Sequence, residues 1–256
     1  MPGRRVFRTA AFMTAFVSVT SAAAGCGGDG SDSKGGSSAS PPTAASPSAS
    51  TPAPQSPSPS PSKSAEPERF QSAVKKVSAD DLPHSWHKGC PVSPSGLRMI
   101  EMTYWGMDHK PHAGGKLVVN AEAADKLVGV FHKLFEERYP IHRMEPVDVF
   151  KGSDFDSIEA DNTSAFNCRN ATGSSNWSQH AYGLAVDLNP CENPYVTASG
   201  HVEHKDCVKF ADRSRKDPGV IHKGDKTVRA FASIDWGWGG SWDGTRDYQH
   251  FSSSGR

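Results

Sequence analysis

The chain has 256 residues, of which 28 are basic and 28 are acidic, so its formal net charge at pH 7 is zero. No basic cluster stands out, and the charge pattern therefore gives no support to nucleic-acid binding. The length suits one folded domain accompanied by segments that do not fold.

The N-terminus has the features of an export signal. Arginines in the first eight residues precede an apolar stretch over residues 9–24, which is shorter than a membrane span, and Cys26 follows. The sequence Ala-Ala-Gly-Cys is similar to a bacterial lipobox, although alanine replaces the usual leucine. We therefore expect residues 1–26 to be a lipoprotein-type signal peptide with Cys26 lipidated. An ordinary secretory signal is the alternative.

Residues 27–65 are almost wholly Gly, Ser, Ala, Pro and Thr. Such a segment cannot bury enough apolar surface to offset its chain entropy, so we expect a disordered tether. Its Ser-Pro repeats would be stiff and extended. Lipid and tether together would hold an extracytoplasmic domain, residues 66–256, at the cell membrane. A secreted protein is the alternative localisation.

Four further cysteines lie in the predicted domain. An even number in an exported chain predicts two disulfides, and four cysteines allow three pairings. We favour Cys191–Cys207, because it closes a local loop worth roughly 3 kcal/mol in the chain-entropy model. Cys90–Cys168 is then the second pair. None of the four has CxxC spacing, so a cysteine-ligated zinc site is not expected.

The first half of the domain predicts strands and one helix. Residues 97–105 are rich in β-formers, and residues 116–119 follow two glycines, so both predict strands. Apolar residues at helical spacing predict a helix from an N-cap at Asn120 to about Arg138. Residues 144–150 predict a further strand.

The second half of the domain also predicts both helices and strands. Residues 154–163 predict a polar loop, and residues 226–234 predict a short helix. Residues 184–189 alternate between apolar and other side chains, which predicts a strand carrying Asp187 on one face. Because strands and helices follow no strict alternation, the fold class is predicted to be α+β.

Two histidines and two aspartates predict a metal site. They are His180, Asp187, His250 and Asp247, which stands three residues before the last histidine. Two imidazoles and one carboxylate suit zinc, and three protein ligands leave a fourth position open for water, as in catalytic zinc sites. A second carboxylate beside that water can act as a general base. These residues therefore point to a zinc hydrolase.

The wider pattern resembles a known family. Ser-x-His-x-x-Gly-x-Ala-x-Asp at residues 178–187, Trp-Gly-Gly-x-Trp at 238–242 and Asp-x-x-His at 247–250 are similar to motifs of the zinc peptidases of bacterial cell walls. This group includes D-alanyl-D-alanine carboxypeptidases and the L-alanyl-D-glutamate endopeptidases of phage endolysins. Ser-Ala-Phe-Asn-Cys-Arg at residues 164–169 adds to the resemblance, which spans most of residues 97–251.

The resemblance implies a role for each motif residue. It places Zn²⁺ on His180, Asp187 and His250. Asp247 would take a proton from the water at the metal and pass it to the leaving amine. Many relatives carry glutamate there, and the endolysin-like branch carries aspartate. The shorter side chain must lie closer to the metal, or its loop must adjust. Arg169 would bind the substrate carbonyl and its oxyanion, a task that suits a fixed fork of donors. A structural salt bridge is the alternative for Arg169.

Two interpretations remain open for other residues of the motifs. Ser178 would bind substrate or orient His180, or it would only form a local turn. Trp242 would contact the stem peptide or glycan, or it would be a core residue. Glycines such as Gly239 would permit close backbone approach near the metal.

The implied fold is the Hedgehog/DD-peptidase type, with a small antiparallel sheet carrying the zinc site and helices packed outside. The implied function is zinc-dependent hydrolysis of peptidoglycan stem peptides by a monomer, and the motifs favour a D-alanyl-D-alanine carboxypeptidase. A wall formed by residues 191–207 on one side of the cleft would suit such an exopeptidase. The alternatives are an L-alanyl-D-glutamate endopeptidase with the same site and a non-catalytic, zinc-containing wall-binding lipoprotein.

Overall fold

The computed structural model describes residues 69–256. The predicted signal, Cys26 and the predicted tether lie outside the described residues. Helices and small, mainly antiparallel sheets are mixed along the chain, in agreement with the predicted α+β class. Within the described range no helix has the length and hydropathy of a membrane span.

The helices are α1 (Ala124–Glu136), α2 (Asp154–Glu159) and α3 (Lys226–Ala232), and the strands are β1 (Ser72–Lys76), β2 (Leu97–Gly106), β3 (Pro111–Asn120), β4 (Pro140–Ile141), β5 (Arg143–Met144), β6 (Asn162–Thr163), β7 (Ala185–Asp187), β8 (Tyr195–Val196), β9 (Gly237–Trp238), β10 (Arg246–Asp247) and β11 (His250–Ser252).

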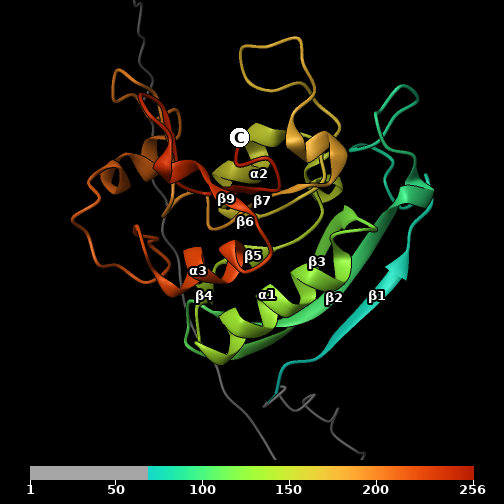
Figure 1. The fold of residues 1–256 in the computed structure, drawn as a ribbon, viewed down its shortest axis with the longest axis horizontal. Coiled ribbons are helices and arrows are strands. Elements are labelled where there is room, and N and C mark those ends of the chain that lie inside the picture. The colour runs from blue at the N-terminus through green and yellow to red at the C-terminus, as the bar shows by residue number, and fades with distance from the viewer. Residues whose placement is uncertain (1–68) are drawn as a thin grey trace, which may run out of the picture. The chain divides into compact units, whose positions relative to one another are not determined.

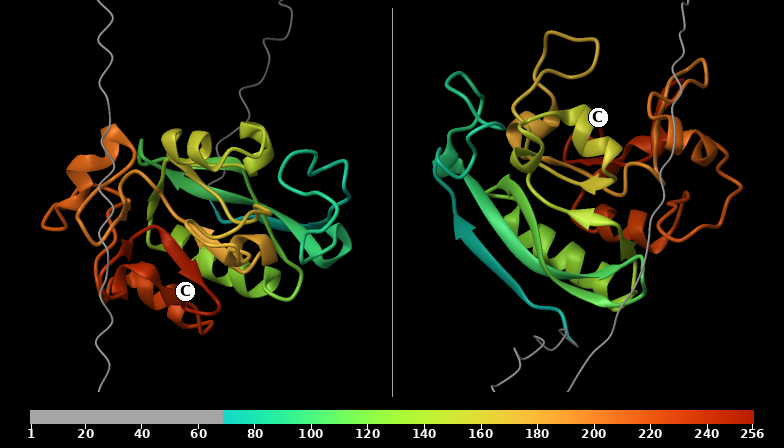
Figure 2. Two further views of the ribbon diagram at one scale, coloured as in Figure 1. Left: turned by 90° about the horizontal axis from the view of Figure 1, so that it is seen from above. Right: turned by 180° about the vertical axis from the view of Figure 1, so that it is seen from behind.

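The largest sheet has the order β1-β2-β3, with β4 added beside β2. Ile100 of β2 lies opposite Leu117 of β3, and this face packs against α1, which runs along the sheet in Figures 1 and 2. Met99 and Val118 pair on the other face, which packs against residues 77–92. Both faces of β2 and β3 are therefore covered, which explains why β2 lacks strict alternation.

A second sheet, of order β7-β11-β9, belongs to the same core. Val186 of β7 and Phe251 of β11 are fully buried. The ring of Phe231 on α3 stacks on Phe251 with centroids 4.0 Å apart, and α3 lies next to α1 in Figure 1. The helices thus tie the β7-β11 pair to the large sheet.

The strands predicted at residues 97–105 and 116–119 are confirmed, and both extend further. The short helix predicted at residues 226–234 is confirmed as α3. β1 was not predicted. Its five residues are all exposed, so no apolar alternation marks it, and only its backbone pairing with β2 defines it.

The N-cap predicted at Asn120 is wrong, because Ala123 occupies the N-cap of α1. Asn120 accepts a hydrogen bond from the N–H of Glu122 through Oδ1 and donates from Nδ2 to the carbonyl of Tyr182 at 3.0 Å. Its side chain therefore joins the end of β3 to the segment that carries His180.

The strand predicted at residues 144–150 is also wrong. β5 ends at Met144, and a 3-10 helix follows at Val147–Phe150. Pro146 has no N–H to contribute to a strand ladder. The Asp148 carboxylate accepts hydrogen bonds from the backbone of residues 84 and 85, which holds the turn in place.

The polar loop predicted at residues 154–163 instead contains α2 and β6. Ser153 caps α2, because its hydroxyl accepts a hydrogen bond from the N–H of Asp156 at 3.1 Å. The helix has only six residues, so its sequence shows too few turns for a helical period to be recognised.

Both predicted disulfides are present. Cys90 is bonded to Cys168, and Cys191 is bonded to Cys207. The pairing favoured from the spacing is therefore confirmed.

Candidate metal centre

His180, Asp187 and His250 converge inside the protein. Asp187 on β7 lies directly opposite His250 on β11, and His180 lies in the 3-10 helix that precedes β7. Directly opposed residues on paired strands have neighbouring side chains. His180 Nε2 lies 3.2 Å from His250 Nδ1, and each of these atoms lies 3.2 Å from an oxygen of Asp187. All three side chains are buried.

The direction of His180 is set by the short 3-10 helix Gln179–Tyr182. Ser178 caps this helix, because its hydroxyl accepts the N–H of His180 at 3.3 Å. Gly183 ends it with φ 65°, and a Cβ there would lie 2.6 Å from the backbone nitrogen of Asn120. Only glycine meets both conditions. The Ser-x-His-x-x-Gly spacing therefore has a local structural reason.

The donor set fits a metal ion. His180 Nδ1 donates to the carbonyl of Ala165 at 2.5 Å, which leaves Nε2 as the lone-pair nitrogen facing Asp187 and His250. Separations of 3.2 Å are close to the edge, about 3.3 Å, of a tetrahedron with zinc–ligand bonds of about 2.0 Å. Within the described chain, the two imidazoles are the only ion-pair partners of the buried Asp187 carboxylate. A cation would complete the charge balance.

Opposing electrostatic effects act on these groups. Burial disfavours the charged form of Asp187, but the imidazoles of His180 and His250 outweigh burial and hold its pKa below the usual range. Burial also disfavours charge on His180, but the Asp187 carboxylate outweighs it and raises the pKa of His180. Protons and a metal ion would therefore compete for the same atoms.

Asp247 is half-buried beside this cluster and is not part of it. It lies on β10, opposite Tyr195 on β8, and its Oδ1 has no hydrogen-bond partner among residues 69–256. Burial and the negative charge of Asp187 raise the pKa of Asp247 to about 7. Gly239 lies against it, since a Cβ there would be 2.5 Å from the Asp247 carbonyl oxygen. The predicted close approach at this glycine is present.

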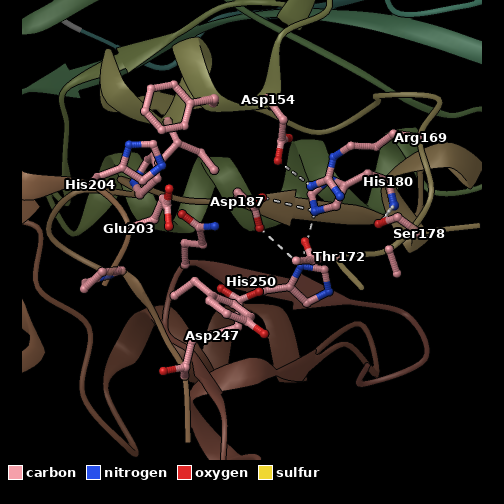
Figure 3. Close-up of a pocket in the computed structure, with 18 of the residues that line it drawn as sticks. Asp154, Arg169, Thr172, Ser178, His180, Asp187, Glu203, His204, Asp247 and His250 are labelled. Carbon is pink, nitrogen blue, oxygen red and sulfur yellow. Dashed lines mark hydrogen bonds and ion pairs between the residues drawn. The ribbon is translucent and has the colours of Figure 1, made fainter. Parts of the chain in front are cut away.

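A cleft of about 710 Å³ opens over the cluster, a size typical of ligand sites. In Figure 3, Arg169 and Asp247 lie on opposite sides of the three clustered side chains. The loop closed by Cys191–Cys207 contributes a wall of the cleft. The lining includes every predicted metal, catalytic and substrate-binding residue: Arg169, Ser178, His180, Asp187, Trp242, Asp247 and His250.

Arg169 enters the cleft as part of a salt bridge, the alternative that the sequence analysis gave for it, with a partner that the sequence did not identify. Its Nη2 lies 2.9 Å from Oδ2 of Asp154, the first residue of α2, and its Nη1 donates to the carbonyl of Asn170 at 3.2 Å. Both Arg169 and Asp154 line the cleft. The only sequence signal next to Asp154 is Ser153, a residue type that favours the N-cap of a helix. An N-cap residue does not indicate which distant side chain the helix will contact.

The tryptophans of the C-terminal motif divide into two kinds. Trp236 and Trp238 are buried core residues. Trp242 lines the cleft, with its ring centroid 5.5 Å from that of His250, and its Nε1 donates to the carbonyl of Gly255 at 2.6 Å. Trp242 is therefore both held by the backbone and available to a ligand.

A buried cluster of two histidines and one aspartate could hold a metal ion, and with a separate carboxylate beside it in a cleft it has the arrangement of hydrolytic metal sites. Residues 172–253 match the family model of the D-alanyl-D-alanine carboxypeptidases. This match supports the family to which the motifs pointed and supports a peptidase. It includes the three clustered residues and Asp247, whereas Arg169 precedes it. No curated protein and no solved structure matched the chain.

Proposed function

We propose that the chain is a zinc-dependent peptidase of the Hedgehog/DD-peptidase fold that removes the terminal D-alanine from peptidoglycan stem peptides. The observation that carries this proposal is the cluster of His180, Asp187 and His250 in the cleft, all within residues 172–253, which match the carboxypeptidase family model. The two imidazoles and the carboxylate would hold Zn²⁺. When bound, zinc supplies a Lewis acid and lowers the pKa of water.

Asp247 would move the proton in this reaction. It would accept a proton from the attacking water and donate it to the leaving amine. A carboxyl whose pKa is about 7 exchanges protons readily in both directions near neutral pH. Its Oδ1 has no hydrogen-bond partner among residues 69–256, which leaves this oxygen available to a proton or a ligand.

Arg169 would donate hydrogen bonds to the scissile carbonyl oxygen as negative charge develops there. A guanidinium stays charged at all relevant pH values and holds its donors in one plane. Trp242 and the Ser178 hydroxyl would contact the peptide beside it, since both line the cleft.

Cleavage at the end of the peptide is supported by the wall that the Cys191–Cys207 loop forms along the cleft. A carboxypeptidase accommodates a chain that ends beyond the scissile bond, whereas an endopeptidase requires a groove open in both directions. We further propose that the domain, residues 66–256, acts as a monomer. A lipid on Cys26 and the 27–65 tether would hold it at the membrane, facing the cell wall.

The test uses the purified chain, loaded with zinc, and a stem pentapeptide, with products identified by mass spectrometry. We expect loss of one terminal alanine that stops when a chelator removes the metal. A cut between L-alanine and D-glutamate would instead establish the endopeptidase. Folded, zinc-containing protein that cleaves neither the pentapeptide nor intact peptidoglycan would favour a non-catalytic wall-binding lipoprotein.

A further inference from the structure

The ion pair between Arg169 and Asp154 joins two segments that the backbone already holds in place. On the arginine side, the N–H of Ser178 donates to the Arg169 carbonyl at 3.1 Å. The N–H of Cys168 donates to the carbonyl of Ser85 at 3.0 Å, and Cys168 is also bonded to Cys90. Arg169 therefore follows a residue that is tied twice to residues 85–90.

The aspartate side is tied to the same loop. Gly152 has φ 76°, and a Cβ there would lie 2.6 Å from the carbonyl oxygen of His84. The Asp148 carboxylate accepts hydrogen bonds from the N–H groups of His84 at 2.8 Å and Ser85 at 2.9 Å. Residues 84–90 thus fix the start of α2 and the backbone of Arg169 relative to one another.

The guanidinium has few other contacts. Nη2 is paired with Asp154, Nη1 donates to the carbonyl of Asn170, and the buried Nε has no hydrogen-bond partner among residues 69–256. The two further aspartates in the cleft lining are Asp187 and Asp247. Without Asp154, the positive charge of Arg169 would be drawn toward those carboxylates, which the proposed reaction needs for the metal and for proton transfer.

We propose that Asp154 is a positioning residue that acts through Arg169. It holds the guanidinium at the side of the cleft opposite Asp247, where the scissile carbonyl oxygen would lie, and keeps it from pairing with Asp187 or Asp247. The role in turnover rests on the proposed function, whereas the positioning itself does not.

The direct test of positioning is independent of catalysis. The Nε–H group of Arg169 is observed by ¹⁵N NMR in the full chain and assigned from its loss in Arg169→Lys. We expect Asp154→Asn to increase its motion on the nanosecond timescale. The matched control is Asp217→Asn, because Asp217 also pairs with an arginine Nη2 at 2.9 Å and both partners are about one-third exposed. Unchanged Arg169 dynamics in Asp154→Asn would overturn the proposal.

Kinetics test the consequence of positioning. We expect Asp154→Ala to lower kcat about 10- to 100-fold with little change in KM, because the oriented donor acts on the developing oxyanion. In an Arg169→Ala background the same change should have almost no further effect. Multiplicative losses in the double variant would show that Asp154 does not act through Arg169 and would overturn the proposal. A wild-type chain that cleaves nothing would refute the proposed function, and the NMR measurement would still decide the positioning.

Discussion

Two aspartates at the site have pKa values displaced in opposite directions. Asp187 lies between two imidazoles, which hold its pKa below the usual range despite burial. At Asp247, burial and the charge of Asp187 outweigh the charges of His250 and Arg169 and raise its pKa to about 7. When the environments of two carboxyl groups move their pKa values apart, the two groups are suited to different chemical roles. Asp187 is suited to bind a cation, and Asp247 is suited to transfer protons.

We expect Asp247→Asn to lower the peptidase activity by about 10²- to 10⁴-fold, the usual contribution of a general acid–base group. The amide is nearly isosteric but cannot accept the proton from water. Because Asp247 lies outside the metal-binding cluster, the bound zinc per chain should not change. Turnover and zinc content are measured on the same preparation. Intact activity would remove Asp247 from this role, and lost zinc would make it a ligand.

Glu192, away from the cluster of His180, Asp187 and His250, also has a displaced pKa. Burial, and then the neighbouring Asp161, raise the pKa of Glu192 to about 9 from an ordinary value of 4.5. Between these values the folded protein keeps a proton that the unfolded chain releases. The free energy of unfolding therefore falls as pH rises through this window, by at most about 1.4 kcal/mol per pH unit.

Glu192→Gln should remove this contribution, because glutamine does not titrate. We expect the variant to gain stability relative to wild type as pH rises from 5 to about 9. Urea unfolding at pH 5, 7 and 9 measures the difference between the two proteins, which cancels the titration of other groups. A difference that stays constant with pH would contradict the assigned pKa.

At the scale of elements, short strands and turns position the side chains of the site. The β7–β11 register puts Asp187 against His250, and a 3-10 helix closed by Gly183 supplies His180. β10 is shorter still, with two residues, and depends on Gly239, whose missing side chain leaves space for the Asp247 backbone. The position of the proposed base is thus set by a contact between two backbone segments.

We expect Gly239→Ala to lower activity about 100-fold, because its Cβ would lie 2.5 Å from the Asp247 carbonyl oxygen and must displace β10. The control is Gly129→Ala in α1, where a Cβ meets no atom within 4 Å. That change should raise the free energy of unfolding by about 1 kcal/mol and leave activity unchanged. Kinetics and thermal unfolding distinguish the two variants. Full activity in Gly239→Ala would show that β10 tolerates the displacement.

At the scale of the whole molecule, one core joins the two sheets and two disulfides hold the cleft walls. Cys90–Cys168 closes 78 residues of sequence and anchors the segment before Arg169, while Cys191–Cys207 closes the loop that lines the cleft. The covalent links therefore restrain two segments that contribute to the cleft.

Replacing Cys90 and Cys168 together by serine should lower the free energy of unfolding by roughly 4 kcal/mol, the chain-entropy value for so long a loop. The matched change at Cys191 and Cys207 should cost roughly 3 kcal/mol, because its loop is shorter. Denaturant unfolding of both double variants gives the comparison. A larger loss from the second pair would indicate that native-state contacts, and not chain entropy, dominate.

The sequence alone determined the α+β class, the cysteine pairing and the residues that gather at the cleft. The site residues were predicted from their donor types and from the resemblance of the motifs to a family. The structure shows that part of this motif spacing, the Ser178 cap and the left-handed Gly183, has causes that act within a few residues. The sequence did not determine α2, the role of Asn120 or the partner of Arg169. Each of these depends on contacts between segments far apart in the chain, such as Asp148 with residues 84 and 85. Packing decides these contacts, and only the tertiary structure brings the segments together.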